Sequence, residues 1–233
     1  YISLWDIEKN QQRNSLKSPI RFAQATALSA KENLSMTGSP DGTLFIADLR
    51  KWEFGREVKA HNDAIESISI SPDEQFFASG SRDGIAKVWS KDGQHVITIA
   101  NDTTSISGLT FSPDGRTLLI AGTDKIARLW NIENGRIISV FQGHSGTITS
   151  LNFSADGSKI LTSSADGTAR VWNLDGAQEL ILFAHKLPIG LACFLRGTRL
   201  IISGGSDSQV LLWDVSSELS EKRRVLADGS GLN

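Results

Sequence analysis

The stretch SSADGTARVWN, residues 163–173, places a tight Asp-Gly turn before a short run that ends on Trp172 and Asn173. The same arrangement recurs along the chain. Tryptophan stands at positions 5, 89, 130, 172 and 213, and Ala47 holds the same register, so the steps are 42, 42, 41, 42 and 41 residues. A period of this length exceeds a single strand or helix. Each unit must therefore be a supersecondary module that buries its apolar faces against its neighbours.

One unit, residues 61–101, shows what such a module contains. It has four short runs rich in β-branched and aromatic residues, at 64–70, 76–81, 85–89 and 95–100. Three turn signals separate the runs: Ser71-Pro72-Asp73, Arg82-Asp83-Gly84 and Lys91-Asp92-Gly93. Proline fixes φ and glycine supplies positive φ at such turns. We therefore predict four antiparallel strands in each unit and, because no helical apolar spacing is sustained, an all-β fold.

Three copies of the turn and of the run after it carry a family resemblance. They lie at residues 79–89, 163–172 and 203–214. With these motifs in tandem, the chain resembles a WD-repeat β-propeller over essentially its whole length. The resemblance implies four-stranded antiparallel blades, of which about six are represented. The expected units are a partial blade at 1–18 and repeats at 19–60, 61–101, 102–143, 144–184 and 185–229.

The length bears on the completeness of the ring. Seven blades need about 290 residues at this period, whereas the chain has 233. We therefore expect an incomplete seven-bladed ring and a fragment of a longer chain. The alternative is a genuinely open or oligomer-completed ring, which would leave apolar faces and strand edges exposed.

The resemblance also implies a hydrogen-bonded tetrad in each full repeat, made of a histidine, a serine or threonine, the turn aspartate and the tryptophan. Three repeats match at identical spacing, with 22 residues from His to Asp and 6 from Asp to Trp. These groups can satisfy one another where an unpaired buried polar group costs roughly 1–3 kcal/mol. The expected members are His61, Ser79, Asp83 and Trp89; His144, Thr162, Asp166 and Trp172; and His185, Ser203, Asp207 and Trp213.

Two units depart from the tetrad. The repeat that ends at Trp130 has Asp102 and Ile120 at the His and Ser positions. The repeat that ends at Ala47 has Pro19 at the His position and lacks the tryptophan. We expect these two blades to be looser than the others.

Histidine, serine and aspartate also form catalytic triads. A triad occurs once and needs oxyanion donors, whereas this set recurs three times with a tryptophan attached, so we interpret it as structural. The tetrad histidines belong to three different repeats, and the single Cys193 lies in an apolar run, which does not suit a metal site. No glycine-rich phosphate loop opens a helix. We expect no metal and no cofactor.

Composition bounds the partner classes. The chain has 24 Lys and Arg against 26 Asp and Glu, and its formal net charge of -2 offers no global basic field for nucleic acid or anionic membrane. No run of about 18 apolar residues could span a bilayer, and no signal peptide is recognisable. One cysteine excludes a disulfide framework. We predict a cytoplasmic protein that binds neither nucleic acid nor membrane.

Partner binding is expected on a rim. In a propeller, the loops before the innermost strands and those between the second and third strands converge on one rim. Residues there that could anchor a partner are Arg82, Glu66, Phe22 and Gln24, since arginine and aromatic side chains dominate interface energetics. Trp52 lies on the opposite rim, where it is a second contact point or merely covers a neighbouring ring. The plainer interpretation makes all of them ordinary rim residues.

We therefore predict a non-enzymatic protein–protein interaction scaffold that binds a peptide or a partner domain on its rim. The alternative is a small-molecule hydrolase or lyase at the channel mouth, for which only Arg82 and Glu66 stand in matching places. A phosphopeptide or nucleic-acid reader would need several cations on one rim. The Ser-Pro-Asp and Ser-Ala-Asp turns look similar to bacterial WD-repeat regions, and this resemblance implies an attached signalling or nucleotide-hydrolysing domain.

A short basic cluster lies near the end of the sequence. Residues 216–224 are largely polar and charged, and they include Lys222, Arg223 and Arg224. Small charge runs are usually solvated. We expect a long connection between a third and a fourth strand here, with a docking motif as the alternative.

Overall fold

The computed structural model describes residues 2–6, 8–16, 23–29, 31, 33–101, 105–183, 185–195, 199–215 and 222–227. Every regular element within them is a β-strand, which confirms the all-β prediction. The strands form one two-stranded sheet and five four-stranded sheets. Pro19, Phe22 and Asp102, which the sequence analysis singled out, lie outside the described residues.

Each four-stranded sheet is one blade, made of four consecutive strands that pair antiparallel in chain order. The two-stranded sheet is β1 (Ile2–Asp6) and β2 (Gln11–Leu16). Blade 1 is β3 (Ala25–Ser29), β4 (Leu34–Gly38), β5 (Thr43–Asp48) and β6 (Glu53–Lys59). Blade 2 is β7 (Ile65–Ile70), β8 (Phe76–Ser81), β9 (Ile85–Ser90) and β10 (His95–Ala100).

The other three blades have the same order. Blade 3 is β11 (Ile106–Phe111), β12 (Thr117–Gly122), β13 (Ile126–Asn131) and β14 (Arg136–Gln142). Blade 4 is β15 (Ile148–Phe153), β16 (Lys159–Ser164), β17 (Thr168–Asn173) and β18 (Gln178–Phe183). Blade 5 is β19 (Ile189–Phe194), β20 (Leu200–Gly205), β21 (Val210–Asp214) and β22 (Lys222–Ala227).

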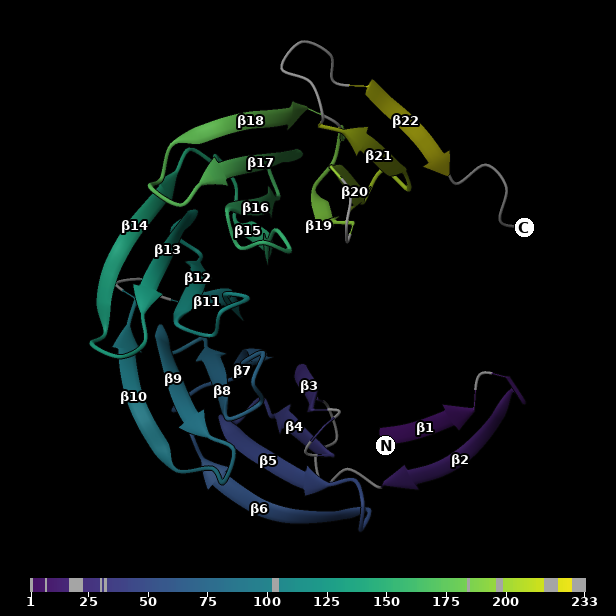
Figure 1. The fold of residues 1–233 in the computed structure, drawn as a ribbon, viewed down its shortest axis with the longest axis vertical. Helices are drawn as coiled ribbons and strands as arrows, with labels where there is room; N and C mark the ends of the chain where they lie inside the picture. Colours follow the sequence, from purple (N-terminus) through teal and green to yellow (C-terminus); the bar gives the residue numbers. More distant parts are fainter. Residues whose placement is uncertain are drawn as a thin grey trace.

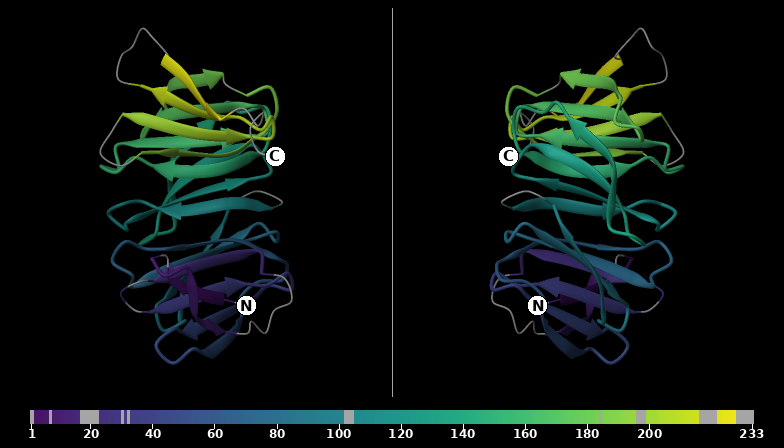
Figure 2. Two further views of the ribbon diagram at one scale, coloured as in Figure 1. Left: turned by 90° about the vertical axis from the view of Figure 1, so that its right-hand side faces the viewer. Right: turned by 90° about the vertical axis from the view of Figure 1, so that its left-hand side faces the viewer.

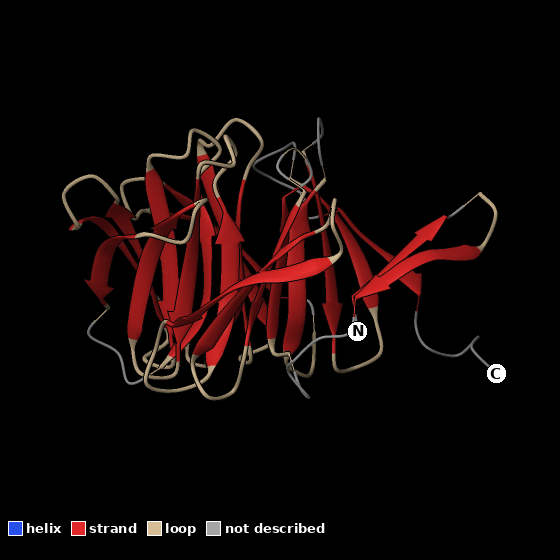
Figure 3. Ribbon diagram, turned by 90° about the horizontal axis from the view of Figure 1, so that it is seen from below, coloured by secondary structure: helices blue, strands red, loops and turns tan. Residues whose placement is uncertain are grey.

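The blades follow one another around an open arc, each with its first strand innermost and its fourth strand outermost (Figure 1). Seen from the side, the connections gather on two rims (Figures 2 and 3). We call one of them the Asp-turn rim. It comprises the connections that precede the first strands and the turns between second and third strands, at 39–42, 81–84, 122–125, 164–167 and 205–208. The opposite rim carries the remaining connections.

The five turns of the Asp-turn rim share one backbone design. In each, the N–H of the fourth residue donates to the carbonyl of the first at 3.2 Å. The turn aspartate accepts the N–H two residues further on, at 2.9–3.3 Å. The fourth residue has positive φ even where it is not glycine, with 68° at Lys125 and 61° at Ser208. The aspartate hydrogen bond therefore holds this turn even where the side chain disfavours it.

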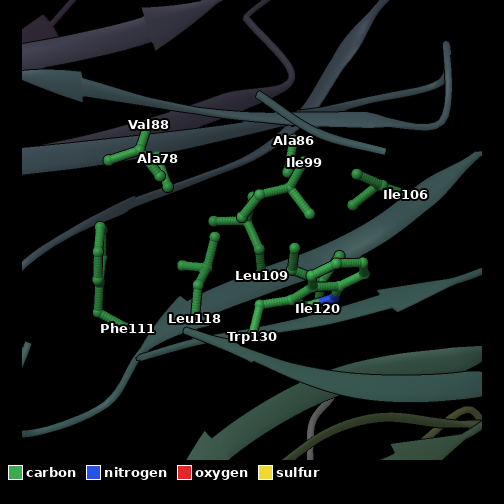
Figure 4. Packing of buried hydrophobic residues seen from close by; sticks show 10 residues of the cluster. All are labelled: Ala78, Ala86, Val88, Ile99, Ile106, Leu109, Phe111, Leu118, Ile120 and Trp130. Atoms are coloured by element: carbon green, nitrogen blue, oxygen red, sulfur yellow. The ribbon is translucent and has the colours of Figure 1, made fainter. Parts of the chain in front are cut away.

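The hydrophobic core lies between blades rather than inside one (Figure 4). The cluster that joins blades 2 and 3 brings Val88 and Ile99 against Leu109, Phe111 and Trp130. Similar clusters join blade 1 to 2, blade 3 to 4 and blade 4 to 5. Burial of one large apolar side chain stabilises by roughly 1.5–3 kcal/mol. A blade is therefore stable chiefly beside its neighbours, as in other repeat architectures.

Side chains of one blade also bond to the backbone edge of the next. Ser67 Oγ accepts the N–H of Leu109 at 3.1 Å, and Ser150 Oγ accepts the N–H of Ala192 at 3.0 Å. These hydroxyls occupy edge groups that would otherwise stay unpaired on the innermost strands. Gly108 has the equivalent register in blade 3 and offers no side chain for this bond.

The predicted connection between a third and a fourth strand ends before the basic cluster, which belongs to the fourth strand itself. Lys222 begins strand β22 and pairs with Asp214 of β21, and Arg223 and Arg224 continue the same strand. An outermost strand lies at the edge of its sheet, so a polar composition does not distinguish it from a connection.

Candidate functional site

Three blades hold a hydrogen-bonded network beside the Asp-turn rim. In blade 4, Trp172 Nε1 donates to Thr162 Oγ1 at 2.9 Å, and His144 Nε2 lies 2.8 Å from the same oxygen. His144 Nδ1 lies 2.9 Å from Asp166 Oδ2. The same three distances, taken in that order, are 2.9, 2.8 and 3.2 Å for Trp89, Ser79, His61 and Asp83 of blade 2. They are 3.0, 2.9 and 2.8 Å for Trp213, Ser203, His185 and Asp207 of blade 5.

One arrangement of protons satisfies every atom of such a network. The indole N–H donates to the Thr162 hydroxyl, and that hydroxyl donates to Nε2 of a neutral His144. The Nδ1–H of His144 then donates to Asp166. We assign this tautomer from the network. The chain of donors runs one way, from the buried indole to the carboxylate at the rim.

The pKa directions agree with neutral histidines and charged aspartates. Burial lowers the pKa of His61 and of His144 below the ordinary value, and the neighbouring carboxylates only partly oppose this effect. Burial opposes the charge of Asp166, but hydrogen bonds from Thr168, His144 and the N–H of Ser145 outweigh it and hold its pKa low. The pKa of Asp83 is lowered in the same manner.

Blade 3 replaces the network with another acceptor. Trp130 Nε1 donates to Asn101 Oδ1 at 3.1 Å, and Asn101 is fully buried. Ile120, at the serine position, is also fully buried. Asn101 was not predicted, because the tetrad spacing leads to the histidine position one residue later, which is Asp102. The signal in the sequence was the side-chain amide of Asn101, which directly follows the outer strand β10.

Blade 1 keeps the threonine of the tetrad without its partners. Thr37 pairs in register with Phe45 as Thr162 pairs with Arg170, yet its hydroxyl has no hydrogen-bond partner among the described residues, and Thr37 is 2% exposed. Ser35, two residues earlier on the same face, is likewise buried with an unpartnered hydroxyl. Ala47 offers no indole N–H at the tryptophan position. The loss of the donor therefore leaves a buried polar group unsatisfied.

The structure brings together two of the predicted partner-binding residues. Arg82 lies in the β8–β9 turn and Glu66 on β7, and Arg82 Nε is 2.5 Å from Glu66 Oε1. The Arg82 side chain remains 53% exposed, compared with 26% for Glu66. The pair thus places a guanidinium on the surface of the Asp-turn rim and holds it from one side. Sequence reasoning selected both residues but not their contact.

The other predicted residues lie apart from this pair. Gln24 is exposed just before β3, on the Asp-turn rim, and its N–H donates to the carbonyl of Gly38 at 3.3 Å. Trp52 lies in the connection before β6, on the opposite rim, where it is partly buried and has a φ of 56°. Phe54 makes an edge-to-face contact with Phe45 at 6.2 Å.

The connection from blade 4 to blade 5 carries exposed apolar residues that the sequence analysis missed. Phe183, the last residue of β18, is 70% exposed, and Leu187 is 50% exposed. Phe183 pairs with Thr168 at the start of β17, so it lies at the Asp-turn end of its strand. A comparison with the polar or small residues at the same positions of the other repeats could have revealed both.

A hollow of about 1160 Å³ lies on the opposite rim, along the junction of blades 3, 4 and 5. Phe153, Leu180 and Phe194 contribute to its apolar lining. Two of its charged groups are paired with each other, since Lys159 Nζ lies 2.5 Å from Glu179 Oε2. This hollow does not coincide with the rim that the sequence analysis selected.

Two features are absent from the described part of the chain. Its residues include no group of three histidine, cysteine, aspartate or glutamate side chains placed to hold a metal ion. They also include no helix long and apolar enough to cross a membrane.

A family model matches the repeats seen in the structure. The WD domain, G-beta repeat model matches residues 52–90, 93–131, 135–173 and 176–214. Each matched unit contains the outermost strand of one blade and the first three strands of the next, and it ends one residue after the tryptophan of the third strand. The matched unit is thus offset from the structural blade by one strand.

Segments of several curated proteins are similar to parts of this chain. The chain is 27% identical over 108 residues to autophagy-related protein 16 of Arabidopsis thaliana, which covers 45% of this chain and 21% of that protein. It is 38% identical over 65 residues to pre-mRNA-processing factor 19 of Caenorhabditis elegans, covering 28% and 13%. With WD repeat-containing protein 1 of Gallus gallus it shares 33% identity over 90 residues, covering 37% and 15%.

The aligned segments span about a fifth or less of these relatives' own length, so the likeness concerns the repeats alone. The four family-model matches cover more than half of this chain. The repeat period, the four-stranded blades and these matches agree, and the chain belongs to the WD-repeat family of β-propeller proteins.

Proposed function

We propose that this protein is a non-enzymatic interaction scaffold that binds a peptide or a partner domain on the Asp-turn rim. WD-repeat proteins are generally protein-interaction scaffolds. The observation that carries the proposal is the exposed Arg82 guanidinium, held by Glu66 above blade 2. Arginine is enriched among the residues that dominate interface energies, and a preorganised side chain loses less entropy on binding.

We also propose that the His, Ser or Thr, Asp and Trp networks serve the rim as structural supports. The oxygen of Thr162, which a triad would use as nucleophile, belongs to a fully buried residue and already accepts the indole N–H of Trp172. Ser79 and Ser203 are similarly enclosed. A substrate carbonyl could not reach these oxygens, whereas three rigid blades would hold the rim loops in place.

The test uses a phage-displayed library of random linear peptides, selected on the immobilised wild-type chain. Affinities of the recovered peptides are then measured by calorimetry against the wild type, Arg82→Ala and a control, Ile138→Ser on the outer strand β14. We expect Arg82→Ala to weaken binding and the control to leave it unchanged. Peptides that bind these three proteins and the Phe183→Ser/Leu187→Ser double variant, which is altered elsewhere on the same rim, with equal affinity would place the interaction outside this rim and contradict the proposal.

The cellular context belongs to the same proposal. We place the protein in the cytoplasm, because its single cysteine, Cys193, provides no disulfide framework. From the resemblance alone, we propose that it works in signalling with a covalently attached signalling or nucleotide-hydrolysing domain. Subcellular fractionation of the natural full-length protein, with mass determination, tests both statements.

A further inference from the structure

The connection between blades 4 and 5 departs from its counterparts in three successive features. Phe183 stands where the same strand position carries Lys59, Ala100 and Gln142 in blades 1, 2 and 3. After the tetrad histidine, Lys186 and Leu187 replace Asn62 and Asp63 of blade 2, and Ser145 and Gly146 of blade 4.

These replacements contribute little to folding. Phe183 and Leu187 are 70% and 50% exposed, and Lys186 is exposed between them in the sequence. Single exposed apolar residues are common on protein surfaces. Phe183 and Leu187 are two large ones with a cation between them in the sequence, on a connection where blades 2 and 4 carry polar or small residues after the tetrad histidine.

The backbone that presents these side chains is held on both sides of Leu187. The N–H of Lys186 donates to Asp207 Oδ2 at 3.3 Å, and the carbonyl of Pro188 accepts the N–H of Ser206 at 2.8 Å. Both bonds tie the connection to the 205–208 turn of blade 5. A fixed backbone with exposed apolar side chains reduces the entropy lost when a partner binds.

We propose that Phe183, Lys186 and Leu187 form a peptide-binding surface on the Asp-turn rim, whose partner segment carries an acidic residue next to an apolar one. This inference rests on the proposed function and specifies its partner. The apolar side chain of the partner packs against Phe183 and Leu187, and the carboxylate pairs with Lys186. Charge complementarity favours an acidic residue, because Lys186 is an exposed cation on the same connection as the exposed Phe183 and Leu187.

The experiment uses the peptides recovered from the random library on the wild-type chain, and measures their affinities for a Phe183→Ser/Leu187→Ser double variant. We expect the enriched peptides to combine an acidic and a large apolar residue. The double variant should bind them about thirtyfold more weakly or worse, the usual cost of losing hot-spot contacts. Lys186→Glu should weaken binding about fivefold, and a peptide with lysine in place of its acidic residue should restore binding to this variant.

Ile138→Ser is the matched control, because Ile138 is also 50% exposed but lies on the outer strand β14. Peptides that lose affinity with Arg82→Ala but bind the double variant normally would overturn this inference and leave the proposed function standing. Failure to recover any binding peptide would contradict both. A concentration-dependent dimer that Leu187→Ser abolishes would overturn the inference in favour of self-association.

Discussion

The same substitution at equivalent positions of two blades should change stability in opposite directions. Thr162 of blade 4 and Thr37 of blade 1 occupy the tetrad's hydroxyl position, and both are buried. Thr162 accepts from Trp172 and contacts His144, whereas the hydroxyl of Thr37 has no partner in the part of the chain that the structure describes. Valine has nearly the same shape as threonine, so each exchange to valine removes the hydroxyl without making a large cavity.

The magnitudes follow from the atoms left behind. Thr162→Val leaves the indole N–H of Trp172 and Nε2 of His144 without partners in a buried site. Each such group costs roughly 1–3 kcal/mol, so we expect a loss of about 3 kcal/mol in the free energy of unfolding. Thr37→Val removes a hydroxyl that was buried unpaired, and we expect a gain of about 1 kcal/mol.

Urea unfolding followed by tryptophan fluorescence measures both effects. With a slope of about 2–3 kcal/mol per molar urea, Thr162→Val should lower the midpoint by about 1 M, while Thr37→Val should raise it by a few tenths. Unchanged slopes would show that the same transition is compared. Equal destabilisation by the two substitutions would refute the reasoning, since it would mean that the hydroxyls contribute irrespective of their partners.

Three further outcomes follow from the geometry. The pKa of His61 and His144 is lower in the folded protein than the ordinary 6.5, so the unfolded chain takes up protons first as the pH falls. Stability should be full at a pH above that ordinary value and fall below it by up to about 1.4 kcal/mol per pH unit for each histidine. A flat urea midpoint between pH 7 and pH 5 would contradict this. Gly108→Ser should stabilise the protein by about 1 kcal/mol in the same urea assay, because the new hydroxyl would accept the N–H of Leu151 as Ser67 accepts that of Leu109. The nearest atom to the added Cβ lies at an ordinary 3.7 Å. A lower urea midpoint would contradict the stabilising role of these serine hydroxyls between blades. Gly42→Ala should lower the thermal unfolding midpoint by several degrees, because φ at Gly42 is 82° and the added Cβ would clash with the carbonyl oxygen of His61. An unchanged thermal midpoint would show that the 39–42 turn can rearrange.

The architecture could be predicted because it depends on a strict period. Register is conserved from one blade to the next, so Trp89, Trp130, Trp172 and Trp213 all lie in third strands. The spacing of 22 and 6 residues likewise selected side chains that lie within hydrogen-bond distance, because the strands and turns between them have constant length.

Features outside the period could not be predicted in this way. Asn101 accepts the indole N–H of Trp130, as the tetrad serine does in blade 2, but it does so from the connection after β10. The repeat spacing alone does not reveal this. The contact between Arg82 and Glu66 depends on the path of a turn over a neighbouring strand. The strand β22 has a polar sequence because it lies at a sheet edge, where composition resembles that of a connection.

By itself, the sequence determined the repeat, the strand count of each blade and the residues that support the Asp turns, because all of these follow from local periodicity and turn chemistry. Only the tertiary structure decided which polar groups are satisfied, which hydroxyls are stranded in blade 1 and which side chains remain exposed on the rim. Burial arises where consecutive blades pack together, and hydrogen bonds such as that from the N–H of Leu109 to Ser67 cross from one blade to the next. A pattern within one repeat specifies a face, but the neighbouring blade determines whether that face is covered.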